Sequence, residues 1–433
     1  MSARESDTHE KAESASVWPP LHLVAECGDV EGVRSLLSDG GPTCEEIEDN
    51  WTPLHLSAEQ GHCEVVAALL EARASVGKRT SNGLTPLHLA SLAKHVDVVV
   101  LLAKEQTGLD EPMVGGWCPL HLSVQMGSHQ AVSALLEGGA TISQKTDDGW
   151  SPLHIAADEG YTNLVRFLLN YSAEVDDQTL MGSTPLDRAI ISRHTDAAEV
   201  LLGAGASCDL RDGWSPVHFA AEEEALEALA LLIGVRASVN TVDGWSPLHV
   251  AAECGHEQAA DLLLTAGAKV HAETETGSTA LQRAVFAGHA RCASCLVRGG
   301  AVEDVVTCAS LLHLAAQAGH AEVVFTLAQV LDTKQTTIDG WTALHFAAHL
   351  GDREVISALS GHQTKTALGR TPLHLAAEAG HMNAVSLLSQ NIDVQMDGGW
   401  TSLHLAVERG EANVVVALLN ARASPATRTT HGW

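Results

Sequence analysis

Apolar positions recur along the chain in pairs of short helical patterns separated by polar turns. Residues 148–175, DGWSPLHIAADEGYTNLVRFLLNYSAEV, display this unit most clearly. Ser151 suits a helix N-cap, and Pro152 suits the first helical position, where a missing N–H costs nothing. Gly160 can take the left-handed conformation that ends this first helix. A second helix is indicated by apolar residues at i, i+1, i+4 and i+5, namely Leu164, Val165, Leu168 and Leu169. The unit therefore predicts a turn, a helix, a second turn and a second helix.

The same capped motif returns thirteen times, at a spacing of 29 to 33 residues. Its copies start at Trp18, Trp51, Leu84, Trp117, Trp150, Ser183, Trp214, Trp245, Ser278, Ala309, Trp341, Arg370 and Trp400. The variation in length falls in the turn between repeats, where the backbone is exposed and changes are well tolerated. One unit is too short to bury its own apolar face, so successive copies must stack on one another.

This pattern closely resembles the ankyrin repeat, whose signature is a turn, T-P-L-H-x-A-A-x-x-G-H, and a second helix ending in L-L-x-x-G-A. The resemblance covers residues 18 to about 426. It implies an all-α solenoid of stacked helix-turn-helix units, with projecting β-turn fingers and a concave groove lined by the fingers and first helices. We expect residues 1–17, which are polar, to form a disordered N-terminal segment. Residues 427–433 read as the start of a truncated further repeat, which suggests a fragment or an incomplete gene product.

Composition narrows the classes of partner. The formal net charge of −29 argues against a nucleic-acid backbone or an anionic membrane surface as the main partner. No apolar run approaches the roughly twenty residues of a membrane span, and the N-terminus lacks the apolar segment of a secretory signal. The nine Cys show no paired disulfide framework. We expect an intracellular, cytoplasmic or nuclear monomer.

Histidine is abundant, but its pattern favours structure over chemistry. Eleven of the 24 His occupy the fifth position of the motif, namely His22, His55, His88, His121, His154, His218, His249, His313, His345, His374 and His404. In the ankyrin family this imidazole links the cap hydroxyl to the neighbouring turn. Asp187 and Gln282 replace it in two repeats, and both can still form hydrogen bonds. We predict no catalytic residue, no metal, no cofactor and no enzymatic activity.

Two local patterns could bind a metal, and neither is persuasive. His345 and His349 have the i, i+4 spacing of a zinc helix, but the Glu of a protease motif is absent. Cys292 and Cys295 align with apolar residues of sister repeats, so we interpret them as small buried side chains.

Tryptophan and acidic residues give the candidate partner-binding positions. All nine Trp stand just before the helix cap, at a turn position that is varied in designed ankyrin binders. A second position, four residues after the motif His, is acidic in seven repeats and lies on the inner face of the first helix in the family. The predicted site residues are Trp51, Trp117, Trp150, Trp214, Trp245, Trp341, Trp400, Glu59, Asp158, Glu222, Glu253, Glu378 and Glu408. Such a surface suits a Lys- or Arg-rich segment, through charge and cation–π contacts of about 0.5–2 kcal/mol each.

Other interpretations stay open at this point. Nine Trp in one position could record the copying of repeats, or the indoles could stiffen neighbouring turns. The sequence favours a non-catalytic protein-interaction scaffold. The alternatives are a targeting or regulatory arm of a larger enzyme, channel or ubiquitin-ligase adaptor, and a spacer with no saturable partner.

Overall fold

A computed structural model describes residues 18–40, 43, 45–209, 213–241, 244–301, 305–359 and 364–432. Within these ranges the chain forms thirteen successive pairs of α-helices, two short 3-10 helices and an isolated antiparallel bridge between Glu273 and Thr279. The predicted all-α repeat architecture is therefore confirmed. The segment 1–17, predicted to be disordered, and Trp433 lie outside the described residues.

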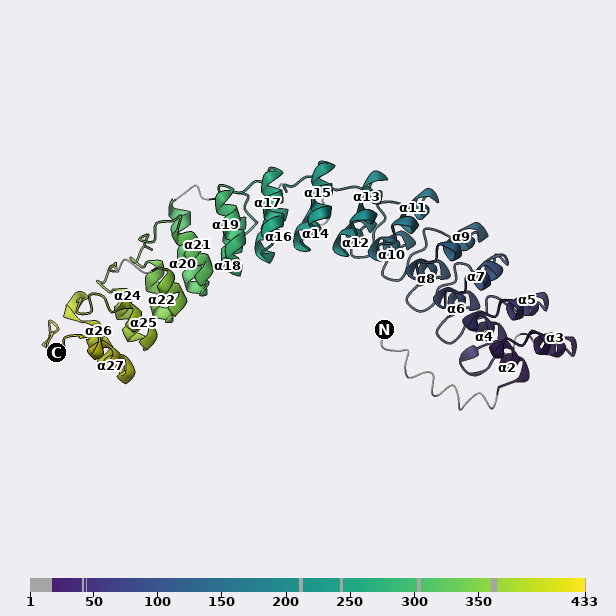
Figure 1. The fold of residues 1–433 in the computed structure, drawn as a ribbon, viewed down its shortest axis with the longest axis horizontal. Coiled ribbons are helices and arrows are strands. Elements are labelled where there is room, and N and C mark those ends of the chain that lie inside the picture. The colour runs from purple at the N-terminus through teal and green to yellow at the C-terminus, as the bar shows by residue number, and fades with distance from the viewer. Residues whose placement is uncertain are drawn as a thin grey trace. The chain divides into compact units, whose positions relative to one another are not determined.

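The chain divides into two compact units between Asp212 and Gly213. In the first unit the helix pairs follow one another in chain order (Figure 1). They are α2 (Pro20–Cys27), α3 (Val30–Ser38), α4 (Pro53–Gln60), α5 (Cys63–Glu71), α6 (Pro86–Leu92), α7 (Val96–Ala103), α8 (Pro119–Gln125), α9 (His129–Gly138), α10 (Pro152–Asp158), α11 (Thr162–Asn170), α12 (Pro185–Ile191) and α13 (Thr195–Gly203). The 3-10 helix η2 (Glu48–Asn50) precedes α4.

The second unit continues the same alternation of first and second helices. Its helices are α14 (Pro216–Glu222), α15 (Leu226–Gly234), α16 (Pro247–Cys254), α17 (Glu257–Thr265), α18 (Ala280–Ala287), α19 (Ala290–Arg298), α20 (Val305–Ala318), α21 (Ala321–Ala328), α22 (Ala343–Leu350), α23 (Arg353–Ala358), α24 (Pro372–Glu378), α25 (Met382–Leu388), α26 (Ser402–Arg409) and α27 (Ala412–Asn420). The 3-10 helix η3 (Asp397–Gly399) precedes α26.

The helix pair α10–α11 illustrates why this sequence folds in this way. Ser151 is extended (φ −90°, ψ 165°), and Pro152 occupies the first helical position of α10. Gly160 has a φ of +72°, a conformation that side chains with a Cβ rarely adopt, and it turns the chain toward α11. The predicted cap, proline and glycine roles are thus confirmed in this repeat.

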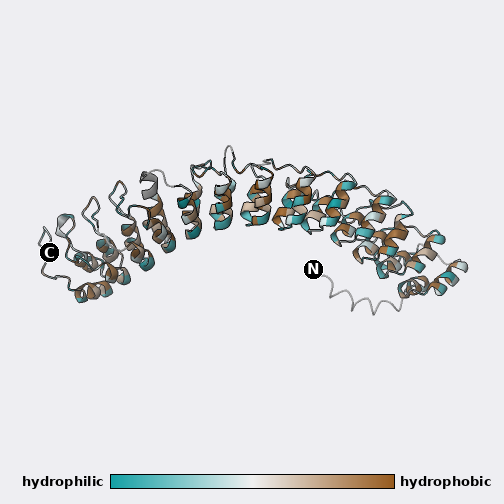
Figure 2. Ribbon diagram, turned by 45° about the horizontal axis from the view of Figure 1, so that its top comes forward, coloured by the Kyte–Doolittle hydropathy of each residue, from teal (hydrophilic) through white to brown (hydrophobic). Residues whose placement is uncertain are grey.

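The core lies between successive helix pairs. Leu153 and Ala156 of α10 and Leu168 of α11 are essentially inaccessible to solvent. The helix α10 packs against both α8 and α12, and α11 packs against α13. Many helices in Figure 2 carry both hydrophobic and hydrophilic residues, as is typical of helices that bury one side. Small Ala side chains on the first helices allow this close stacking.

One first helix differs from the sequence prediction. The motif at Ala309 predicts a helix that starts after Ser310, whereas α20 starts at Val305 and runs to Ala318. The prediction of a turn and cap at this point is wrong. This repeat has Leu311 where most sister repeats have proline, so no missing N–H marks the first turn and an earlier start is tolerated.

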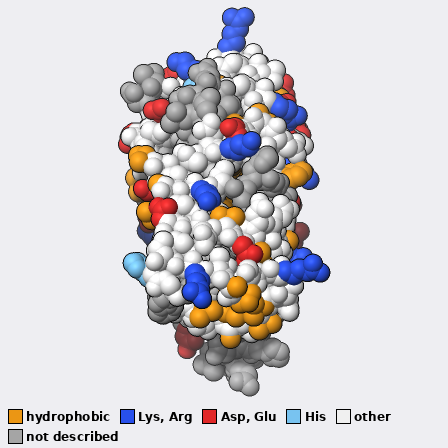
Figure 3. All heavy atoms as spheres, turned by 90° about the vertical axis from the view of Figure 1, so that its left-hand side faces the viewer, with side chains coloured by type: hydrophobic (Ala, Val, Ile, Leu, Met, Phe, Trp, Pro, Cys, Tyr) orange, Lys and Arg blue, Asp and Glu red, His pale blue; other side chains and the backbone are white. Residues whose placement is uncertain are grey.

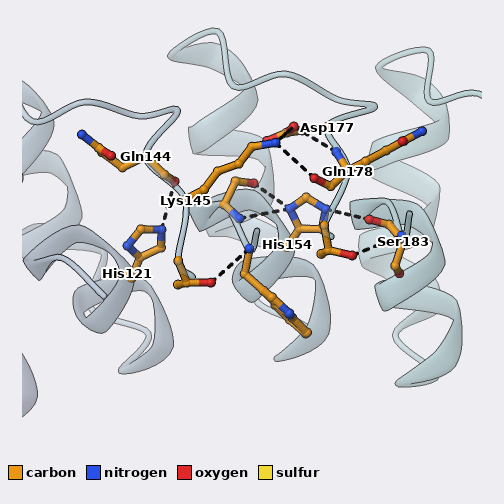
Figure 4. Close-up of polar contacts among 11 residues, drawn as sticks. His121, Gln144, Lys145, His154, Asp177, Gln178 and Ser183 are labelled. Atoms are coloured by element: carbon orange, nitrogen blue, oxygen red, sulfur yellow. Dashed lines mark hydrogen bonds and ion pairs between the residues drawn. The ribbon is translucent and has the colours of Figure 1, made fainter. Parts of the chain in front are cut away.

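The fingers between helix pairs are joined by main-chain hydrogen bonds. Asp147 N–H donates to Gly115 O at 3.0 Å, and Leu180 N–H donates to Asp148 O at 3.0 Å. The Lys145 ammonium also reaches the next finger, where it pairs with Asp177 (Figure 4). The last described finger follows the same rule, because Thr430 N–H donates to Gly398 O at 3.0 Å.

The surface carries a few exposed apolar side chains. In the last helix pair Val407, Val416 and Leu419 are 58%, 57% and 44% exposed. Figure 3 views the molecule from the side on which α26 and α27 lie, and it shows one gathered hydrophobic patch among scattered charged side chains.

Candidate partner-binding surface

Each motif Trp is positioned by the end of a finger. Thr146 N–H donates to Trp150 O at 3.0 Å, and Trp150 N–H donates to the Thr146 hydroxyl oxygen at 3.1 Å. These two bonds close the turn around Gly149, whose φ is +82°. The indole therefore leaves the backbone at a fixed point, immediately before the first helix of its own repeat.

Every predicted Trp lies against the motif His of its own repeat. The ring centroids of the seven pairs are 5.5–6.2 Å apart. Trp245 is 36% exposed, and the other six indoles are half-buried. Each ring thus has one side fixed by the fold and retains an accessible portion, which is an arrangement typical of aromatic side chains at interfaces.

The predicted acidic residues lie in the last turn of the first helices. Asp158, Glu222 and Glu378 are the final residues of α10, α14 and α24. Glu59, Glu253 and Glu408 are the penultimate residues of α4, α16 and α26. A carboxylate at this end of a helix faces the negative pole of the helix dipole, so a nearby cation is needed to stabilise it.

At Asp158 that cation comes from the next repeat. The Arg188 guanidinium lies 2.6 Å from Asp158 Oδ1 and 4.7 Å from the centre of the Trp150 ring. The Ser192 hydroxyl donates to the same carboxylate oxygen at 2.8 Å. The predicted site residues Trp150 and Asp158 are therefore brought together, and an arginine of the same chain occupies the position between them.

The second unit contains the same arrangement. The Arg283 Nε atom lies 2.9 Å from Glu253 Oε2, and its guanidinium carbon lies 4.7 Å from the centre of the Trp245 ring. Both arginines follow the motif position at which His is replaced, by Asp187 in one repeat and by Gln282 in the other. Sister repeats place a buried apolar residue there, namely Leu56, Leu89, Leu122, Ile155, Val250 or Leu375.

The sequence interpretation did not identify these two arginines. The available signal was the joint departure of both repeats from the consensus, since each lacks Trp and the motif His and instead carries Arg.

The carboxylate of Glu378 is also paired within the chain, with Arg370 at 2.9 Å and with Arg409 at 2.6 Å. The interaction with Glu378 raises the pKa of Arg409.

The other predicted residues have different surroundings. Trp214 and Trp341 each pack on a phenylalanine of their own repeat, with ring centroids 5.3 Å from Phe219 and 5.0 Å from Phe346. Glu222 and Glu408 are exposed, and Glu59 is half-buried. The repeat of Trp117 carries Gln125 at the acidic position.

The motif histidines are structural groups in the described repeats. In nine of them the N–H of the cap residue donates to imidazole Nδ1 at 3.0–3.2 Å. In ten, imidazole Nε2 lies 3.0–3.3 Å from a backbone carbonyl oxygen of the next finger, as His121 and His154 do in Figure 4. A backbone N–H can only donate and a carbonyl can only accept, so the ring is neutral with its proton on Nε2.

Burial agrees with this protonation state. It lowers the pKa of His154 to about 4, and it has the same effect, to about 4, on five other imidazoles. These are His55, His88, His121, His345 and His374. The predicted replacements also form cap bonds, because Thr184 N–H donates to Asp187 Oδ2 and Thr279 N–H donates to Gln282 Oε1, both at 2.9 Å.

A second set of histidines was missed by the sequence interpretation. These residues immediately precede the second helices, and Nε2 of each lies 2.9–3.0 Å from a backbone carbonyl oxygen of the preceding repeat. They are His62, His95, His256, His289, His320 and His381. A Gly-His pair after the first helix precedes five of these six second helices, and Lys94 replaces the glycine before His95, so this pair was the signal that could have identified them.

The candidate metal patterns have structural surroundings. His345 bonds to Thr342 and to Arg370 O, and His349 packs edge-on against Trp341 with ring centroids 5.8 Å apart. Cys292 and Cys295 are buried, as predicted, and burial raises the pKa of the Cys292 thiol to about 12. Within the described ranges, no group of three or more His, Cys, Asp or Glu is placed to hold a metal ion.

None of the helices in the described part of the chain has both the length and the apolar character needed to cross a membrane. A family model described as ankyrin repeats (3 copies) matches residues 4–80, 72–146, 120–212, 204–274, 281–367, 312–397 and 359–429. The chain is also similar to an ankyrin repeat domain-containing protein, SAT10, of Stachybotrys chartarum, with 36% identity over 107 residues. That match covers 24% of this chain and spans only 6% of the length of SAT10. The matched segments extend over nearly the whole sequence, and the chain belongs to the ankyrin-repeat family.

Proposed function

We propose that this chain is a non-catalytic protein-interaction scaffold that binds a protein partner through its motif Trp and the acidic residues at the ends of its first helices. The partner segment would be rich in Arg or Lys. One observation carries the proposal, namely the internal arginine that lies on Trp150 and pairs with Asp158. An indole and a carboxylate so placed form a receptor for a guanidinium group.

If the motif Trp stabilise the fold, their rings should pack against groups of the same chain instead of contacting a partner. Trp150 and Trp245 each carry an internal arginine, so these two indoles contribute to the fold. Among the residues that the structure describes, no cation lies over the ring of Trp117 or Trp214, and both indoles are half-buried, so they are the better candidates for partner contact. A structural role for Trp150 and Trp245 is therefore compatible with partner contact by Trp117 and Trp214.

Affinity capture with substituted chains tests this function. We expect Trp117→Ala and Trp214→Ala to weaken capture of the partner, each by about 2 kcal/mol if the indole is a central contact, with little change in thermal stability. Higher salt should weaken capture as well, because the chain is strongly acidic. The control is Phe325→Ala on α21, which removes a side chain that is 57% exposed on a second helix. Equal capture by all three variants, or loss of stability instead of binding, would contradict the proposal.

A second role is supported by the length of the relative. SAT10 is far longer than its matched segment, so a targeting or regulatory arm within a larger protein is the alternative function. The coding sequence around this chain would test it, because an adjoining catalytic, channel or adaptor domain is expected only under this alternative.

A further inference from the structure

The two internal arginines reveal which side chain the indole–carboxylate pairs accept. At both places the guanidinium stacks 4.7 Å from an indole centre while one of its nitrogens approaches a carboxylate oxygen at 2.6 or 2.9 Å. Arginine can do both because its planar fork presents a flat face to the ring and N–H groups at its edge. A lysine ammonium is a compact, strongly hydrated charge and lacks that planar face.

The repeat of Trp214 has the same indole and carboxylate but a different neighbour. Its acidic residue Glu222 ends α14, as Asp158 ends α10. The next repeat supplies Val250 at the position where Arg188 and Arg283 stand in their repeats, and Val250 is only 4% exposed. The indole and the carboxylate of this repeat therefore stand without the arginine that lies on Trp245 in the sister repeat.

Charge at the end of α14 favours a cation from outside the chain. Glu222 is followed by Glu223 and Glu224, and most sister repeats have a glycine at the position of Glu224. Glu222, Glu253 and Glu223 act together to raise the pKa of the Cys254 thiol, after the larger effect of burial, so their fields converge there. Glu253 is paired with Arg283, and the Glu224 carboxylate lies 3.4 Å from His256 Nδ1.

We propose that Trp214 and Glu222 form a receptor for one arginine side chain of the protein partner, in the arrangement that Arg283 adopts on Trp245 and Glu253. This inference rests on the proposed function and specifies the residue of the partner that is recognised. It also assigns a role to Arg283, which occupies Trp245 and Glu253 and thereby keeps the partner's arginine from binding there.

Fluorine NMR of the full chain labelled with fluorotryptophan tests the receptor directly. The probe is N-acetyl-arginine methylamide at millimolar concentrations, and N-acetyl-lysine methylamide is the matched control compound. The Trp214 and Trp245 signals are assigned by single Trp→Phe substitutions. We expect the arginine compound to shift the Trp214 signal, to leave the Trp245 signal in place, and to shift Trp214 more than the lysine compound does.

Two variants complete the test. Glu222→Gln should abolish the shift of the Trp214 signal, and the exposure of Glu222 makes this change compatible with folding. Arg283→Val introduces the residue found at Val250 and empties the sister receptor, so the Trp245 signal should then respond to the arginine compound. A Trp214 signal that does not move, or a Trp245 signal that moves as much in the unmodified chain as in Arg283→Val, would overturn the proposal.

The failure of this inference can be told apart from the failure of the proposed function. Partner capture that depends on Trp117 and Trp214, together with a Trp214 signal that ignores arginine, retains the scaffold and refutes the arginine receptor. A Trp214 signal that responds to arginine, together with capture unaffected by either Trp→Ala change, supports the receptor and refutes the proposed surface.

Discussion

The motif histidine acts as a two-ended connector. Its Nδ1 accepts from the cap residue and its Nε2 donates to the next finger, so one neutral ring satisfies groups of two repeats. His22 is an exception at one end, because the cap position before it holds Pro19, which has neither an N–H nor a hydroxyl. The Nδ1 atom of His22 is accordingly buried without a hydrogen-bond partner.

This unpartnered nitrogen predicts a difference in stability between two substitutions at Pro19. Pro19→Ser supplies the hydroxyl and the N–H that sister caps use, at a residue whose backbone is already extended (φ −58°, ψ 147°). Pro19→Ala is the matched control, since it loses the same proline and restores only the N–H. We expect the serine variant to exceed the alanine variant in free energy of unfolding by about 0.5–1 kcal/mol, as measured by urea denaturation. Equal stabilities would show that His22 Nδ1 does not need a hydroxyl partner.

The roles of the motif residues could be predicted from the sequence, whereas the arginine that contacts Trp150 could not. The cap, Pro152, His154 and Gly160 act locally, so their roles follow from type and spacing alone. Arg188 acts across the interface between repeats, at a position that is apolar in sister repeats, and its contact with Trp150 depends on how two helices stack. Local patterns do not contain that information.

At the scale of elements, the close approach of a first helix to the next repeat depends on the glycine that follows it. A Cβ on Gly255 would lie 2.4 Å from Nδ1 of His289, the ring that bonds to Glu253 O at 2.9 Å. The same contact recurs at Gly61 with His95 and at Gly160 with His194. The glycine thus serves the helix end and leaves space for the imidazole of the next repeat.

A pair of alanine substitutions separates these two effects. Gly255 and Gly410 have φ values of +79° and +75°, but a Cβ on Gly410 meets nothing within 4 Å. Gly410→Ala should cost only the left-handed strain, about 1–2 kcal/mol. Gly255→Ala should cost about 1 kcal/mol more, because His289 must move and lose its hydrogen bond. Thermal or urea unfolding measures both, and equal losses would refute a packing role for His289.

The helix α20 marks the limit of sequence prediction at this scale. The repeat register identified its motif, in which Leu311 and Leu312 are buried. The start of the helix at Val305 was not predicted, although Asp304 immediately before it is a residue type that favours helix N-caps, because the repeat register placed the cap at Ser310.

At the scale of the whole molecule, the strongest packing contacts among the described helices join members of one pair or successive pairs. The array pattern made this arrangement predictable from sequence, since each unit can bury its apolar face only against the next. Because most repeats carry the same motif His, buried neutral imidazoles occur in many repeats along the chain. Stability toward acid is therefore a property of the entire array.

This distribution predicts a steep loss of stability in mild acid. Six imidazoles have a pKa of about 4 in the folded chain against an ordinary value of 6.5. Between these values the unfolded chain binds more protons, so the free energy of unfolding is intact above pH 6.5 and falls as pH drops toward 4. Each imidazole contributes a slope of up to about 1.4 kcal/mol per pH unit.

His154→Gln isolates one of these contributions. Glutamine keeps the cap bond, as Gln282 does, but it does not titrate. We expect a cost of about 1 kcal/mol near neutral pH from the lost bond to Ser183 O, and a smaller dependence of stability on pH. Urea midpoints at several pH values measure both effects. An unchanged pH dependence would indicate that His154 does not contribute to acid sensitivity.

The motif histidines and the histidines before the second helices both bond to main-chain carbonyls, so a repeat can be deleted from the gene without removing a side chain to which they bond. In-frame recombination that removed residues 119–151 would join Cys118 to Pro152 and leave His88 its acceptor at Trp117 O. The junction would need no new side chain, because every repeat offers the same carbonyl. The Trp–Arg–carboxylate contacts do not share this freedom. Separating Trp245 from Arg283 would open a receptor that the present chain keeps filled.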